Sequence, residues 1–192
     1  MTSKLKTIVV FMLLSVLLTG CNNPLEESLK TRMQQMSEMA DFGSVEYTVK
    51  KVIKASDVQW YTVGDRKILF TCTAYLKAGI DLGKLSDEDV IIDKADKAVE
   101  VTLPHAKLLS INMPAEAVVL EYSSVSFFRS SFSAEERNEL LKQGEADIIA
   151  DVGNMGILAD AESNASDFFS AMLYQLGFEK VTVKFEDKEE VL

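Results

Sequence analysis

The chain contains one histidine and two cysteines, which limits the chemistry that its side chains can support. The usual zinc ligand sets cannot be assembled from so few residues, and two cysteines exclude a disulfide-dense scaffold. The G-x-S-x-G motif of serine hydrolases and the G-x-x-x-x-G-K-[ST] and G-x-G-x-x-G motifs of nucleotide-binding loops are also missing. We therefore expect neither a metal ion nor a cofactor.

Basic residues are scarce as well. Lys and Arg number 20 against 30 Asp and Glu, which gives a formal net charge of −10. This balance argues against a nucleic-acid partner, because such proteins need an excess of cations to neutralise phosphates. The composition, 47% hydrophobic and 26% charged, is that of a globular protein with one or two domains in 192 residues.

The first 20 residues have the layout of a bacterial signal peptide. Two lysines precede an apolar run over residues 8–18, which is too short to cross a bilayer comfortably. The next residues, LTGC ending at Cys21, resemble the lipobox of bacterial lipoproteins. That resemblance implies cleavage before Cys21 and acyl chains such as palmitate on this residue, which together anchor a protein stably to a membrane. The alternative is an uncleaved N-terminal anchor.

The lipobox resemblance also predicts a location. We expect a lipid-anchored protein of the cell envelope. By analogy with enteric lipoproteins, Asn22 after the cysteine favours the outer membrane, on its periplasmic or surface side. Removing residues 1–20 with their two lysines leaves 172 residues and a formal net charge of −12.

A short amphipathic helix is predicted directly after the anchor, within residues 21–43. Apolar residues recur at helical spacing from about residue 24 to 41. Met33, Met36 and Met39 form a stripe that suits either an adaptable membrane or partner surface, or packing on the core.

The rest of the chain reads as a single α+β domain, residues 44–187, followed by an acidic tail at 188–192. We expect a mostly antiparallel sheet built as a meander, with a C-terminal helix pair packed on one face. Ser133 and Glu136 fit a capping box, and Gly177 fits a helix C-terminus. The predicted strands lie near residues 45–49, 67–77, 99–103, 108–113, 118–122 and 181–185, and the helices over 134–151 and 157–176. The apolar stripe of the second helix is expected to comprise Ile157, Ala161, Ala165, Phe168, Met172 and Leu176.

Cys72 lies in the clearest strand and is expected to be a small buried residue rather than a reactive thiol. It shares one face of the strand with Phe70 and Ala74, and no basic residue lies near it within the strand. His105, next to Pro104, is expected to be a strand-end or turn residue rather than a catalytic base.

The segment 123–133 is the most unusual part of the chain. It places Phe127, Phe128, Arg129 and Phe132 among serines, between a predicted strand and a predicted helix. Exposed aromatic rings beside an arginine suit an interface, so these four residues form a possible binding loop. The alternative is that the rings cover the sheet edge.

Acidic residues offer two further hypotheses. Asp81, Asp87, Asp89 and Asp93 could divide acid and base roles in a hydrolase or transferase. The acidic run 87–89 together with Asp93 suggests a calcium site, but its spacing departs from the EF-hand loop, so we expect a solvated acidic loop there. Residues 143–179 contain seven acidic residues and neither lysine nor arginine. Such a stretch could attract a cationic partner or act as a solubilising surface.

Three short stretches resemble the bacterial family called domain of unknown function 4230 (DUF4230). They are AGIDL at 78–82, LPHAKLLS at 103–110 and LGFEKVTV at 176–183, and the resemblance covers about residues 45–187. The family implies an α+β domain, often behind an export signal or membrane segment. It brings no established activity, so the resemblance assigns no catalytic residue.

These observations predict a non-enzymatic binding or scaffold module, held at the membrane through Cys21, with an envelope protein as its partner. The alternative is an envelope hydrolase or transferase that uses the four aspartates.

Metabolic labelling with a fatty-acid probe tests the anchor. We expect the wild-type protein to carry the label and Cys21→Ser to lose it, because serine lacks the sulfur that receives the lipid. Cys72→Ser is the matched control and should keep the label. Equal labelling of wild type and Cys21→Ser would contradict the lipobox assignment.

Overall fold

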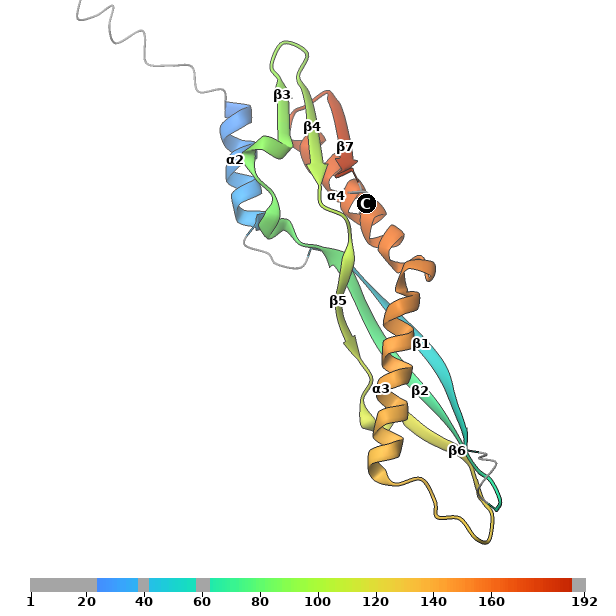
Figure 1. Ribbon diagram of the computed structural model, residues 1–192. Coiled ribbons are helices and arrows are strands. Elements are labelled where there is room, and N and C mark those ends of the chain that lie inside the picture. The colour runs from blue at the N-terminus through green and yellow to red at the C-terminus, as the bar shows by residue number, and fades with distance from the viewer. Residues whose placement is uncertain (1–23, 38–41, 58–62, 188–192) are drawn as a thin grey trace, which may run out of the picture.

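The computed structural model describes residues 24–37, 42–57 and 63–187, which form an elongated α+β molecule (Figure 1). The predicted fold class is confirmed. The helices and strands are α2 (Pro24–Ser37), β1 (Phe42–Asp57), β2 (Arg66–Ile80), β3 (Val90–Asp93), β4 (Ala98–Leu103), β5 (Lys107–Asn112), β6 (Val118–Val125), α3 (Ala134–Asp151), α4 (Ile157–Leu176) and β7 (Lys180–Phe185). None of the helices in these ranges is long and apolar enough to cross a membrane.

A long hairpin of β1 and β2 runs through the molecule. The two strands pair antiparallel from Asp57 opposite Arg66 to Val45 opposite Ala78. The other edge of β2 is shared by β6, which pairs with its first half, and β5, which pairs with its second half. Both strands of the hairpin are longer than the alternating patterns predict.

A second sheet contains β3, β4 and β7, so the predicted single meander is wrong. β4 pairs antiparallel with β3 and parallel with β7. None of these three strands pairs with a strand of the hairpin sheet. Pro104 directly follows β4 and has no N–H to donate to a ladder. The chain therefore leaves one sheet at this point and enters the other as β5.

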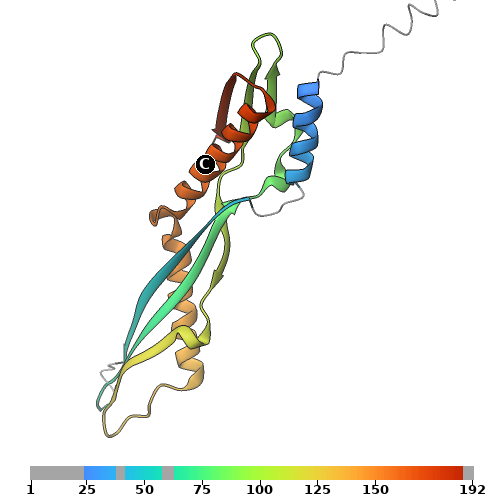
Figure 2. The ribbon, with the colours of Figure 1, turned by 180° about the vertical axis from the view of Figure 1, so that it is seen from behind.

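The helices α3 and α4 lie on one side of the strands, as predicted, and they follow each other end to end (Figures 1 and 2). α4 buries Ile157, Ala161 and Ala165 as expected, but Phe169 is fully buried whereas Phe168 is 45% exposed. Repeated spacing by four residues leads from Ala165 to Phe169, and both Phe168 and Phe169 pack edge-on against Phe42. The apolar stripe therefore continues through Phe169 and, one turn later, Leu173, and not through Phe168 as predicted.

Two apolar clusters form the core. The larger one lies around α4 and includes Leu29 of α2, with Met33 partly buried against it. The smaller one lies between the hairpin and α3 and includes Cys72, whose side chain is fully buried, as predicted. Burial raises the pKa of the Cys72 thiol, which keeps it protonated. Met39 of the predicted stripe lies outside the described residues, as does any continuation of α2 beyond Ser37.

The approach of α3 to β1 depends on a glycine. A Cβ atom on Gly144 would lie 2.2 Å from Cδ1 of Ile53, which is far inside normal contact distance. Gly144 therefore lets the helix pack directly on the strand, and Lys51 extends from the same side of β1 to Asp147 at 3.8 Å.

Gly144→Val should lower the free energy of unfolding by about 1–3 kcal/mol, because the added branches overpack the contact with Ile53. Gly153→Val is the matched control, since no atom lies within 4 Å of a Cβ at that position. We expect the control to change stability by no more than about 0.5 kcal/mol. Denaturant unfolding measures both variants, and equal losses would show that the contact is not specific.

Candidate functional site

The segment between β6 and α3 forms one tip of the molecule, at the end opposite α2 (Figure 1). β6 pairs with β2 as far as Val125 opposite Arg66, so the segment starts beside the end of the long hairpin. We call residues 126–133 the tip loop. It contains all four residues of the predicted binding loop.

Phe127 and Phe128 project from the tip loop into solvent. Their side chains are 94% and 76% exposed, and the two rings lie edge to face with centroids 5.1 Å apart. Burying such rings against a partner removes a large apolar area from water, and aromatic anchors of this kind dominate the binding energy of many interfaces. The pair is therefore a candidate contact surface.

Arg129 holds the tip loop against the hairpin. Its Nη2 donates to Asp57 Oδ2 at 2.5 Å, and the same oxygen accepts from Arg66 Nε at 2.9 Å. Arg66 also donates two bonds to Glu136, at 2.5 and 3.0 Å, in the paired geometry that guanidinium and carboxylate groups favour. The side chains of Arg66, Arg129 and Asp57 are between 13% and 19% exposed, so solvent screens this network only partly.

Glu136 links this network to the start of α3. The hydrogen bond from Arg66, followed by the backbone bond from Ser133, holds the pKa of the Glu136 carboxyl below its usual 4.5. Since the folded-state pKa is lowered, the ion pair contributes stability above the ordinary pKa and loses it as the pH falls through the lowered value. Ser133 and Glu136 also form the predicted capping box.

Phe132 has a different role from the two exposed rings. It packs against the smaller apolar cluster, and the guanidinium of Arg66 lies 4.3 Å from the centre of its ring. The structure therefore divides the predicted binding loop. Phe127 and Phe128 are available to a partner, whereas Arg129 and Phe132 fix the position of the loop.

The turn that precedes β2 supports the tip loop from the other side. Gly64 has a φ of +93°, and a Cβ there would lie 2.5 Å from the Cβ of Ser126. Asp65 exchanges hydrogen bonds with Ser126 through both backbone and side-chain atoms. A shallow hollow of about 540 Å³ lies here, between Val63, Phe128 and the two arginines. Sequence reasoning missed Val63, Arg66 and Asp57 because nothing local places them beside a loop that lies more than 60 residues away.

The four aspartates of the catalytic alternative serve local contacts. Asp81 accepts from Lys107 Nζ at 2.7 Å and from the backbone N–H of Gly83, and the contact with Lys107 is the main cause of its lowered pKa. Asp89 accepts from Ser86, and Asp93 from the backbone amides of the turn that follows it. Asp87 is exposed, and none of these contacts joins two of the four. Within the described ranges, no group of three or more His, Cys, Asp and Glu side chains could hold a metal ion.

His105 lies between β4 and β5, at the strand end that the sequence predicts. Its Nδ1 is 2.8 Å from Oε1 of Glu162, and the backbone N–H of Ala106 donates to the same oxygen at 3.2 Å. The imidazole stacks on Phe185 at 6.0 Å between ring centroids. The histidine thus ties the link between the two sheets to α4.

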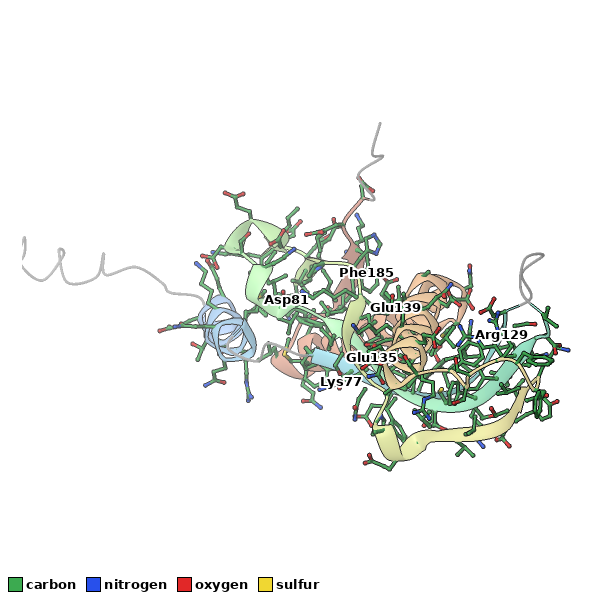
Figure 3. All side chains as sticks on the ribbon, turned by 60° about the horizontal axis from the view of Figure 1, so that its bottom comes forward. Lys77, Asp81, Arg129, Glu135, Glu139 and Phe185 are labelled. Carbon is green, nitrogen blue, oxygen red and sulfur yellow. The ribbon has the colours of Figure 1, made fainter. Side chains whose placement is uncertain are left out.

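The tip loop and the aspartates lie at different ends of the molecule, and Figure 3 shows Arg129 far from Asp81. The described part of the chain is thus an α+β domain with an exposed tip loop, in which the four aspartates make separate local contacts. The comparison with family models identifies it further. The chain belongs to DUF4230, a family described as a protein of unknown function, whose model matches residues 34–183. Neither the curated proteins nor the solved structures contain a significant match to the chain.

Asp57→Asn should destabilise the fold by about 1–3 kcal/mol, because two largely buried guanidinium groups then lose their shared carboxylate. Asp96→Asn is the matched control: its partner Lys180 and its own side chain are both at least 60% exposed, so little change is expected. Denaturant unfolding gives the free energies. An Asp57→Asn variant as stable as the control would show that the network does not hold the tip.

Proposed function

We propose that this protein is a lipid-anchored, non-enzymatic binding module of the cell envelope, in which Cys21 holds one end at a membrane and Phe127 and Phe128 bind an envelope protein at the other. The observation that carries the proposal is the exposure of two adjacent phenylalanine rings on a loop that is otherwise firmly fixed. The partner surface that fits them is an apolar groove wide enough for two rings.

The position of the rings supports this proposal. Cys21 precedes α2 by three residues, and α2 lies at the end of the molecule opposite the tip loop (Figure 1). A domain anchored near α2 therefore presents the rings away from its attachment point. The long hairpin sets the distance between the two ends.

The rigidity of the tip also favours binding. Ser126 holds the loop before its exposed part through Asp65, and Arg129 and Phe132 hold it after that part, through Asp57 and Arg66. A fixed loop loses little conformational entropy when a partner covers it, so more of the apolar burial appears as affinity. Exposed rings on a rigid support are the arrangement expected of interface anchors.

Photo-crosslinking in cell membranes tests the proposal. The full chain carries a photoreactive residue at Ser131, and we expect a protein adduct of defined size that disappears in Phe127→Ser/Phe128→Ser. Ile91→Ser, which removes an apolar side chain on β3 at a residue that is 63% exposed, should leave the adduct unchanged. Adducts that persist without the two phenylalanines, or that contain lipid instead of protein, would overturn the proposal.

A further inference from the structure

One side of the hairpin sheet is covered by α3 and α4, whereas no element in the described ranges covers the other side (Figure 2). Alternate residues of the strands point to this open side. Among them, Lys50 and Lys54 of β1 are exposed, and Val52 between them is 50% exposed. We call this surface the lysine face; its members are Lys50, Val52, Lys54, Tyr75, Val119 and Tyr122.

The lysine face is continuous across three strands. Val52 lies opposite Thr71 of β2, which lies opposite Val119 of β6, and Lys54 is joined in the same way through Leu69 to Tyr122. The large apolar members are each about half exposed. Within the described residues, neither Lys50 nor Lys54 has an ion-pair partner. The face therefore offers apolar area together with unpaired positive charge.

The opposite side of the molecule has the opposite charge. Residues 143–179 contain seven acidic residues and no basic residue. Asp160 and Asp167 are exposed on α4, seven residues apart, with Tyr174 continuing the same row. Oδ2 of Asp160 accepts from the hydroxyl of Tyr47 at 2.6 Å, so Asp160 offers its second oxygen to a partner. We call these three residues the acidic row. It also combines charge with an exposed apolar side chain.

We propose that the lysine face of one copy binds the acidic row of a second copy, so that copies associate through two different sides of the chain. In a protein with a net charge of −10, the lysine face is a surface where positive charge is left unpaired, and its complement is present on the same chain. Contacts between copies with opposite charges and apolar residues on both faces satisfy the usual anatomy of an interface.

The spacing of the charges supports this pairing. Lys50 and Lys54 are about 14 Å apart along an extended strand. Asp160 and Asp167 are about 10 Å apart along a helix, and seven residues are close to two full turns, which places both on one side. The flexible stems of the lysines cover the difference. Two ion pairs can therefore form at once, with Val52 between them.

The proposed contact has a geometric consequence. The two faces are different surfaces of one chain, so each copy can bind one neighbour through its strands and another through its helices. Such a heterologous contact produces a closed ring or an open row of copies rather than an isolated dimer. The tip loop is part of neither face and stays available in every copy.

Co-precipitation of two differently tagged full chains tests this inference. The tagged copies are extracted in excess detergent, so that two copies rarely share a micelle by chance. The variants are Lys50→Glu/Lys54→Glu and Asp160→Lys/Asp167→Lys, and Lys84→Glu is the control because Lys84 is exposed outside both faces. We expect wild type and control to co-precipitate at low salt, and each charge-reversed variant paired with itself to fall by about tenfold or more.

Mixing the two charge-reversed variants provides the decisive result. The new glutamates of the first variant can pair with the new lysines of the second, so co-precipitation should return. Its return would also show that both variants are folded. A wild-type chain that does not co-precipitate at low salt, or a mixture that does not recover, overturns the proposal. Phe127→Ser/Phe128→Ser should self-associate like wild type, which separates this contact from the tip.

A photoreactive residue at Val52 of the full chain provides a second measurement in intact membranes. We expect an adduct whose mass is twice that of the chain and whose crosslinked peptide comes from α4. A lipid adduct at this position would mean that the open face lies on the bilayer, and it would overturn the pairing between copies.

Discussion

The pairing of β1 with β2 is the constraint on which the rest of the structure depends. Two strands of about 15 residues extend for about 50 Å, whereas α3 and α4 are each no longer than about 30 Å. The chain meets this demand with two helices placed end to end, each above its own apolar cluster. Gly144 permits α3 to pack on the hairpin at contact distance. With both helices on one side, no helix of the described residues covers the other side of the sheet.

Local signals in the sequence predicted local structure well. The capping box of Ser133 and Glu136 marked the start of α3, and alternation placed Cys72 in the core. The choice between Phe168 and Phe169 failed because two adjacent aromatic residues fit one helical period almost equally. Both rings contact Phe42, and only the packing of α4 on the core buries Phe169 and leaves Phe168 partly exposed. The parallel pairing of β4 with β7 could not be predicted, since strand patterns carry no information about which distant strand is the neighbour.

The candidate site shows the same division between local and distant information. Composition alone singled out the tip loop, and Phe127 and Phe128 are exposed. The partners that hold the loop come from β1, β2 and α3, and only the fold brings Asp57 and Arg66 beside Arg129. The two exposed rings are therefore followed directly by Arg129, whose charged side chain holds the loop on the hairpin. The proposed contact surface is thus separate from the interactions that hold the loop in place.

The parallel pair of β4 and β7 affects the order in which the domain can assemble. Their paired residues are 82 positions apart, as between Ala98 and Lys180, whereas the β1–β2 ladder closes through a short connection. Closing a long loop costs more chain entropy and slows folding. The β1–β2 and β3–β4 hairpins can thus form early with local contacts, whereas β7 can pair with β4 only after the chain of α3 and α4 has brought it there. Completing the second sheet is therefore the step with the largest entropic cost of loop closure.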